Sequence, residues 1–176
     1  MSPRVVLLPL WCACVPDALP DPTGTDGSVS LIATPMDWSP AASDLDPIPE
    51  HRPLDDRCPE GSWGEEDGAL EVSTGLCRYA WLEQPVATRV PSGAVLRAEV
   101  WHTGLDAPEP AEAHVALLMG ETVAWEAWAA VPSDPTLWEV LLDVDTPLAA
   151  GEPLRLHLHN HGANAWKLGP VTIEAP

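Results

Sequence analysis

The chain has few basic residues. Lysine and arginine together number 8, against 27 aspartates and glutamates, which gives a formal net charge of −19 at pH 7. A surface of that sign repels the phosphates of nucleic acids and the headgroups of anionic lipid surfaces. Nucleic acid is therefore excluded as a partner. Lysine occurs once, at Lys167, and phenylalanine does not occur, a bias typical of a GC-rich genome.

Long apolar runs are also lacking. The apolar run from Val5 to Cys14 is about half of the roughly 20 residues that a permanent transmembrane helix needs, so a stable helical anchor is not expected. One positive charge, Arg4, precedes the run and small residues end it, which is typical of a signal peptide. We therefore expect residues 1–13 to be a signal peptide and the protein to be exported.

The end of this leader resembles the lipobox of bacterial lipoproteins, because Ala13 stands immediately before Cys14. The resemblance implies that Cys14 is acylated and holds the protein at the outer membrane or cell surface through a lipid alone. Trp11 stands where leucine is usual in a lipobox, and Cys12 is unusual there. The alternatives are plain cleavage, which would give a periplasmic or secreted protein, and either a wrongly assigned start or a buried N-terminal strand.

Motifs of common enzyme classes are missing. The sequence has no GxSxG nucleophile elbow, HExxH zinc motif, P-loop or GxGxxG loop. Acid pairs such as Glu109 and Glu112 occur, but a chain with 27 acids always offers such a pair, and they keep the surface solvated. We expect no enzymatic activity.

Zinc-type cysteine spacing is absent as well. With Cys12 and Cys14 in the leader, Cys58 and Cys77 remain, and neither belongs to a CxxC motif. An even pair in an exported domain predicts a disulfide. A bridge of this span would stabilise the fold by about 3 kcal/mol, because it restricts the unfolded chain.

Residues 14–57 have the composition of an acidic, proline-rich linker. Prolines and aspartates recur there with few periodic apolar residues, which predicts a disordered tether in front of a domain at 58–176. One patch, Ser30 to Thr34 followed by Met36 and Trp38, is more apolar. The alternative for this patch is that it docks on the domain.

Beyond residue 57, short apolar runs alternate with glycine and proline turns, the pattern of an antiparallel β-sandwich. Period-two alternation is clearest in 96–101 and 154–159. The stretch 113–131 is apolar on both parities, so we expect a central hairpin there, with a helix as the alternative. The predicted strands are 69–73, 77–84, 94–102, 113–119, 122–131, 137–144, 153–160 and 165–174.

The run from Leu154 to Trp166 is an alternating strand that passes through an Asn/Gly turn into a Trp-bearing final strand. It resembles the closing strands of galactose-binding-like jelly rolls and of carbohydrate-binding modules. The segment from Val90 to Val100 is similar to their early turn, glycine and alternating strand. The resemblance covers 69–174 and implies an all-β, antiparallel jelly-roll β-sandwich of about eight strands. A fold of this kind does not fix a function.

Three histidines, His157, His159 and His161, alternate along one predicted strand. The first two would share a face of the sheet, with their Cα atoms about 7 Å apart. A metal ion is the one cofactor that this pattern indicates, and it needs at least a third ligand from another element. Contacts with an organic ligand and an ordinary polar sheet face are the alternatives. Candidate further ligands are His102, His114, Glu109 and Glu112.

Trp101 is the first candidate for a ligand platform. If its apolar neighbours in 96–100 point inward, Trp101 shares the polar face with Arg97 and Glu99. An indole among polar groups can stack on the apolar face of a sugar while those groups bind hydroxyls. The candidate ligand-binding residues are Trp101, His157, His159, Asn164 and Trp166.

These observations together predict a non-catalytic ligand-binding module of an exported, lipid-anchored envelope protein. We expect a monomer whose ligand is a glycan or another small molecule. A His-based metal-binding β-sandwich and a structural envelope lipoprotein without a small-molecule site are the alternatives.

Overall fold

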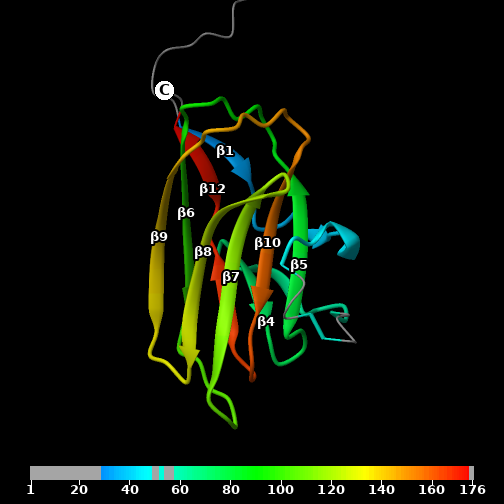
Figure 1. The fold of residues 1–176 in the computed structure, drawn as a ribbon, viewed down its shortest axis with the longest axis vertical. Coiled ribbons are helices and arrows are strands. Elements are labelled where there is room, and N and C mark those ends of the chain that lie inside the picture. Colours follow the sequence, from blue (N-terminus) through cyan, green and yellow to red (C-terminus); the bar gives the residue numbers. More distant parts are fainter. Residues whose placement is uncertain (1–28, 49–51, 54–57, 175–176) are drawn as a thin grey trace, which may run out of the picture.

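The computed structural model describes residues 29–48, 52–53 and 58–174. In that part of the chain the elements are β-strands and a 3₁₀ turn, η1 (Ser43–Leu45), and the strands form two antiparallel sheets that face each other (Figure 1). The larger sheet contains β1 (Val29–Ala33), β3 (Trp63–Glu66), β4 (Ala69–Ser73), β6 (Val95–His102), β9 (Thr136–Asp143), β11 (Ala165–Leu168) and β12 (Val171–Glu174). The smaller sheet contains β2 (Ser39–Pro40), β5 (Tyr79–Pro85), β7 (Ala111–Met119), β8 (Thr122–Val131) and β10 (Pro153–His159).

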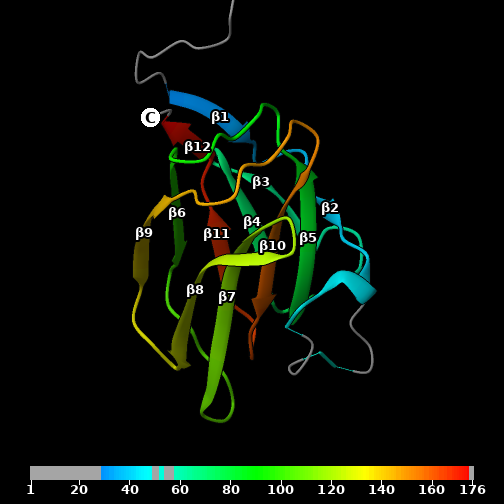
Figure 2. The same ribbon diagram turned by 45° about the horizontal axis from the view of Figure 1, so that its top comes forward.

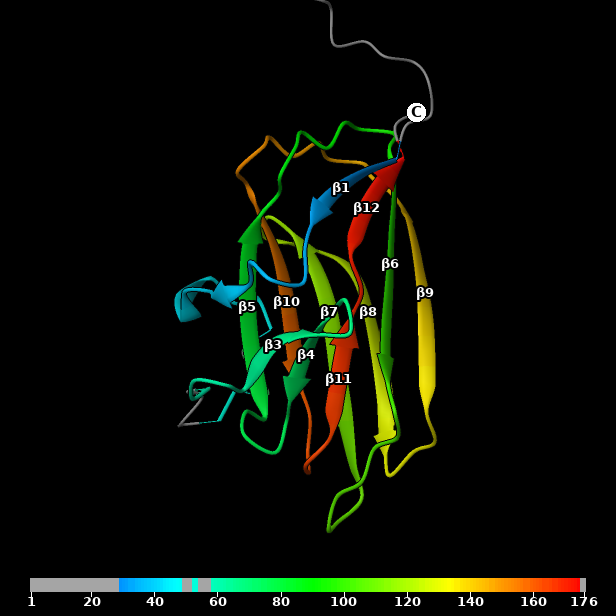
Figure 3. The same cartoon turned by 180° about the vertical axis from the view of Figure 1, so that it is seen from behind.

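The predicted all-β antiparallel sandwich is confirmed. The smaller sheet has the strand order β2-β5-β10-β7-β8. In the larger sheet β6 pairs with β9 along one edge, and β11 and β12 share its other edge, one after the other (Figure 3). The predicted strand 165–174 is therefore two strands, divided at Gly169 and Pro170. The described residues form twelve strands rather than about eight, because β1, β2 and β3 add to the predicted set and 165–174 is divided into β11 and β12.

The core lies between the two sheets and follows the alternation of the strands. In β6, Leu96, Ala98 and Val100 are buried, whereas Arg97 and Glu99 are exposed. In β10, Leu154, Leu156 and Leu158 face the same interior and pack with the inner residues of β6 in one apolar cluster. Alternate residues point to opposite faces of a strand, so each sheet closes the core with one face.

The stretch 111–131 forms the β7–β8 hairpin and no helix. Its register pairs Leu117 with Trp125, and a bulge after Leu117 brings Leu118 opposite Val123. Gly120 forms the turn with a φ of 61°, a conformation that side chains rarely adopt. Both parities of this stretch are apolar because β7 is buried on both faces.

The sandwich begins earlier than the predicted boundary at residue 58. β1 pairs with β12, and Ile32 in β1 and Trp38 beyond it are buried in the core. The linker predicted over 14–57 is thus wrong for 29–48, where the apolar patch around Ile32 supplies enough buried surface to hold the segment on the sheets. The predicted signal peptide 1–13, Cys14 and the rest of the linker to residue 28 lie outside the described residues.

The Cys58–Cys77 disulfide is confirmed, and it joins the chain before β3 to the chain before β5. Across the described residues, no helix has both the length and the apolar character needed to cross a membrane.

Candidate functional site

His157 and His159 lie on the outer face of the smaller sheet. His157 is fully buried, and its ring centroid is 5.1 Å from that of Tyr79 and 5.0 Å from that of His114. The ring of Tyr79 also lies beside His159, at 6.2 Å. The two histidines share a face, as their spacing predicts. That face is covered at His157, so a ligand cannot reach this ring from solvent in this conformation.

The cover is the segment from Ala41 to Ile48 together with Arg52, which we call the cover segment; it runs beside β5 (Figure 2). The indole Nε1 of Trp81 donates a hydrogen bond to the carbonyl oxygen of Ala42 at 3.0 Å. Ala41 and Ile48 pack against the apolar side chains of this face. The part of the smaller sheet formed by β5 and β10 is therefore an internal packing surface.

Asp46 is the polar centre of this packing. Its Oδ1 accepts the backbone N–H of Ile48 at 2.9 Å and lies 3.8 Å from Nδ1 of His157. Its Oδ2 accepts hydrogen bonds from Nη2 of Arg52, at 2.9 Å, and from the hydroxyl of Tyr79. Burial, and then the neighbouring Asp46 carboxylate, raise the pKa of Tyr79 well above its ordinary value. The phenol therefore acts as a donor that holds the cover segment.

His102 and Trp166 lie in the interior between the sheets. Their exposed fractions are 1% and 2%, and their ring centroids are 4.8 Å apart. Trp138 stacks on Trp166 at 5.8 Å. Burial lowers the pKa of His102, which favours a neutral ring. The predicted role of Trp166 as a ligand contact is wrong, because this indole is a core side chain.

Asn164 joins two loops instead of facing a ligand. Its Oδ1 accepts the backbone N–H of Asp106 at 2.8 Å, and its Nδ2 donates to the carbonyl oxygens of Asp106 and His161 at 3.1 and 2.9 Å. The same loops meet so closely at Gly162 that a Cβ there would lie 1.9 Å from the Asp106 carbonyl oxygen. The predicted ligand contact at Asn164 is therefore replaced by a structural one.

The histidines of the predicted metal site lie in two places. His102 is in the interior on β6, whereas His114, His157 and His159 are on the outer face of the smaller sheet. Within the described ranges, no three histidine, cysteine, aspartate or glutamate side chains are grouped so that they could hold a metal ion. The metal-site hypothesis thus has no support from the described geometry.

Trp101 lies on the outer face of the larger sheet, together with Arg97 and Glu99, as the alternation of β6 predicts. The neighbouring strand β9 runs antiparallel to β6 and places a residue opposite each of them on the same face. The opposed pairs are Trp101 with Leu137, Glu99 with Glu139, and Arg97 with Leu141. This face therefore combines an indole, two leucines and three charges.

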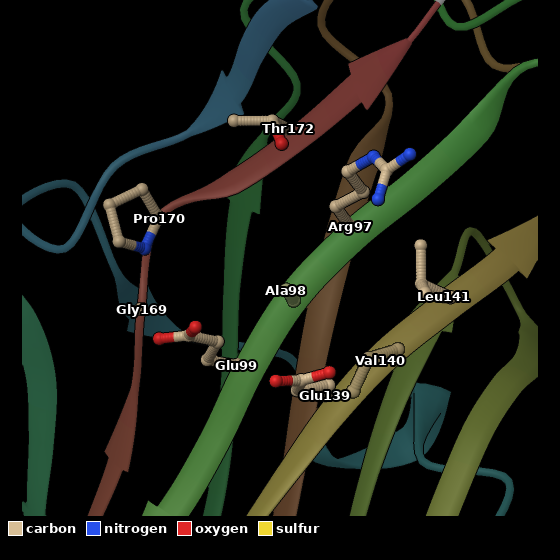
Figure 4. Close-up of a pocket in the computed structure, with 9 residues that line it drawn as sticks. All are labelled: Arg97, Ala98, Glu99, Glu139, Val140, Leu141, Gly169, Pro170 and Thr172. Carbon is tan, nitrogen blue, oxygen red and sulfur yellow. The ribbon is translucent and has the colours of Figure 1, made fainter.

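Two hollows open on this face, and we call them together the open-face groove. The first, of about 400 Å³, is shown in Figure 4, where the carboxylates of Glu99 and Glu139 project from neighbouring strands. It is lined by Arg97, Ala98, Glu99, Glu139, Val140, Leu141, Gly169, Pro170 and Thr172. The second, of about 470 Å³, is lined by Glu99, Trp101, His102, Thr103, Pro135, Thr136 and Leu137. Glu99 borders both hollows.

The step between β11 and β12 shapes the middle of the groove. The backbone N–H of Gly169 donates to the carbonyl oxygen of Glu99 at 2.9 Å, which keeps the chain beside β6 while it changes from one strand to the next. A Cβ at Gly169 would lie 3.7 Å from Cζ3 of Trp101. The indole edge therefore rests against backbone that has no side chain, and Trp101 as a whole is partly exposed.

The charges on this face are unevenly compensated. Arg97 forms an ion pair with Glu174 at 2.9 Å. Lys167 lies 3.3 Å from a carboxylate oxygen of Glu66 and 3.3 Å from one of Glu71. Within the described residues, Glu99 and Glu139 are in no ion pair. The floor of the groove therefore carries net negative charge.

Sequence reasoning does not identify Leu137, Glu139 and Leu141 as members of this site. The strand that contains them is predicted almost to the residue, but its partner strand is not readable from local pattern. The sequence does contain one signal: Leu137 and Leu141 alternate in step with the acids Glu139 and Asp143, so all four side chains share one face of the strand. Two acids on a face indicate that this face is the solvent-exposed one. Both leucines are 54% exposed, so this parity is the outer one.

No family model and no curated protein matches the chain. Among solved structures, it is similar to a cleaved adhesin domain of Lys-gingipain from Porphyromonas gingivalis, with 12% identity over 83% of this chain and 100% of that chain and a TM-score of 0.48. It is also similar to the C-terminal CBM6 of LamC, a marine laminarinase from Zobellia galactanivorans (19% identity, 65% and 89% covered, TM-score 0.38). A third is TmCBM61 in complex with β-1,4-galactotriose (11% identity, 62% and 71% covered, TM-score 0.35). These neighbours are adhesin-domain and carbohydrate-binding-module β-sandwiches.

Proposed function

We propose that this protein is a non-catalytic carbohydrate-binding module and that the open-face groove is its binding site. The observation that carries the proposal is Trp101, a partly exposed indole that lines a hollow of about 470 Å³ on the outer face of a sheet. An indole presents a flat apolar surface to the CH face of a sugar ring. Trp101 is also not among the partly buried apolar residues that pack against the core cluster, whereas Trp63, Trp125 and Trp138 are.

The residues around Trp101 supply the polar half of sugar recognition. The Glu99 carboxylate can accept hydrogen bonds from hydroxyls, and so can the Thr136 hydroxyl, which itself donates to the Asp134 carbonyl oxygen. Leu137, opposite Trp101, extends the apolar surface on which a ring would rest. Apolar walls with a few polar groups are the usual composition of a small-molecule site.

The groove is longer than one sugar ring. Trp101 and Arg97 are four residues apart on β6, which corresponds to about 13 Å along an extended strand. The two hollows meet at Glu99 between them. A chain of several sugar units therefore fits this site better than a monosaccharide.

The same proposal includes an extracytoplasmic, monomeric protein tied to the outer membrane or cell surface by a lipid on Cys14. The Cys58–Cys77 disulfide supports export, since such bridges persist in oxidising compartments. Secretion without a lipid is the other form that export could take. Mass spectrometry of the mature protein from its membrane fraction distinguishes the two, because acylation adds fatty-acid mass to Cys14.

The test of the binding site is a glycan array followed by calorimetry with the best oligosaccharide. Trp101→Ala should weaken binding at least about ten-fold, since the loss of one stacking surface is worth more than about 1.4 kcal/mol. The control is Trp128→Ala, which removes a tryptophan 45% exposed on the other sheet and should leave the affinity unchanged. Bound oligosaccharide should be recovered uncleaved. Wild-type protein that binds no glycan, or a Trp101→Ala variant with full affinity, would contradict the proposal.

A further inference from the structure

We infer that the glycan held in the open-face groove carries positive charge, as an unacetylated amino sugar does. The inference rests on the proposed function, because it concerns the ligand of the same groove. It is drawn from three features of that groove: the opposition of Glu99 and Glu139, the engagement of the nearby cations elsewhere, and the place of Trp101 beside the carboxylates.

Glu99 and Glu139 are directly opposed across β6 and β9, and both project into the first hollow (Figure 4). Like charges directly opposite each other destabilise a sheet. A cation between the two carboxylates would remove the repulsion and gain an attraction to both.

The protein does not supply that cation from the face itself. The guanidinium of Arg97, the nearest basic residue on β6, is paired with Glu174 at 2.9 Å. The ammonium of Lys167, which lies opposite Trp101 on β11, is held between Glu66 and Glu71 at 3.3 Å from each. Both of these cations are thus paired with carboxylates that line neither hollow, and among the described residues Glu99 and Glu139 have no ion-pair partner.

Trp101 complements a positive charge as well as a sugar ring. Glu99 lines both hollows and Trp101 lines the second, so an ammonium bound at Glu99 lies next to the indole. The face of a tryptophan attracts a cation within about 6 Å of its ring centroid. A ligand with an apolar ring face and an ammonium substituent uses the indole and the carboxylates together, whereas a neutral sugar uses the carboxylates only as hydrogen-bond acceptors.

The net charge of −19 attracts any polycation weakly, so the test must separate the groove from this background. The probes are a glucosamine tetramer, its fully N-acetylated counterpart and a neutral glucose tetramer of the same linkage. Binding to full-length protein is measured by calorimetry in mildly acidic buffer, so that the amino groups of the glucosamine tetramer are protonated. Variants are Glu99→Gln and Glu139→Gln, with Glu121→Gln as the control, because Glu121 is an exposed acid in the β7–β8 turn.

We expect the glucosamine tetramer to bind at least about ten-fold more tightly than the acetylated and neutral tetramers. Glu99→Gln and Glu139→Gln should each reduce that affinity about five-fold, which corresponds to about 1 kcal/mol per lost charge contact. Glu121→Gln should leave it within about two-fold. Raising the salt concentration should weaken binding of the amine-bearing tetramer and leave the neutral ones unchanged.

Other outcomes divide the two proposals. If all tetramers bind equally, depend on Trp101 and ignore both glutamine variants, the inference of a cationic ligand is wrong and the carbohydrate-binding function stands. If the glucosamine tetramer binds but Glu121→Gln weakens it as much as Glu99→Gln does, its binding is a property of the whole surface and the inference is wrong. If no tetramer and no arrayed glycan binds, both proposals are wrong.

Discussion

The hydroxyl of Tyr79 on β5 donates a hydrogen bond to the carboxylate of Asp46 in the cover segment, which fastens 41–48 to the smaller sheet. The same carboxylate accepts from Arg52 and from the backbone of Ile48. One buried carboxylate thus accepts hydrogen bonds from three donors, two in the cover segment and one on the sheet.

Asp46→Ala should destabilise the protein by about 2–4 kcal/mol, since it removes the buried carboxylate that accepts hydrogen bonds from Tyr79, Arg52 and the Ile48 N–H. Urea unfolding followed by tryptophan fluorescence measures the change. Asp44→Ala is the matched control, because Asp44 is exposed in η1 and should cost less than about 0.5 kcal/mol. Equal urea midpoints for the two variants would show that Asp46 does not hold the segment.

Stability should fall in alkaline solution through Tyr79. Its pKa is raised in the folded protein by burial and by Asp46. Because this pKa is raised, the Tyr79 hydroxyl of the folded protein keeps its proton at pH values at which the hydroxyl of the unfolded chain has lost it. The free energy of unfolding therefore decreases as the pH rises above about 10, the ordinary pKa of tyrosine. Tyr79→Phe should be less stable than wild type at neutral pH and should show a smaller decrease. A parallel pH profile in both proteins would be evidence against this linkage.

Asn164→Ala should lower stability by about 2 kcal/mol, because the substitution leaves the backbone N–H and C=O of Asp106 without a partner. Binding in the open-face groove should be unaltered, since Asn164 does not line it. Trp101→Ala should show the reverse, with weakened glycan binding and a small change in unfolding. Thermal unfolding and calorimetric titration of both variants test the contrast. If Asn164→Ala lost glycan binding but unfolded at the same temperature as wild type, the result would support the sequence-based prediction that Asn164 contacts the ligand.

Removing the disulfide should cost about 3 kcal/mol, as expected for a bridge between residues separated by 19 positions. The measurement compares wild type with the Cys58→Ser/Cys77→Ser double variant in guanidinium chloride. A reductant should bring wild type to the stability of the double variant and leave the double variant unchanged. Insensitivity of wild type to the reductant would indicate that the bridge is absent in solution.

Alternation along single strands predicted more of this molecule than any longer-range feature. The outward position of Trp101 follows from four neighbours in β6, and the inward leucines of β10 follow in the same way. β3 could not be predicted from the sequence, because Trp63-Gly64-Glu65-Glu66 contains only one large apolar residue. The segment is a strand because it pairs with β4, and its composition does not indicate this.

The histidines of β10 show where local pattern fails. His157 has the parity of an outer, polar sheet face, and in sequence it looks exposed. The cover segment, more than a hundred residues earlier in the chain, makes it one of the most buried side chains. Likewise, the opposition of Glu99 and Glu139 is a matter of register between two strands, which neither strand specifies alone.

The pairing of Val29 with Glu174 places the first residue of β1 beside the last residue of β12, at one end of the molecule (Figure 1). Tension applied at these two points would pull on neighbours that run in opposite directions. The hydrogen bonds between β1 and β12 would then break one after another, starting from the pair at the loaded end, instead of sharing the force. β12 pairs only with the first part of β6, whereas Trp101 lies in the later part of β6 and pairs with Lys167 on β11. Under mechanical load the molecule would therefore lose its first strand while the ring of Trp101 kept its place.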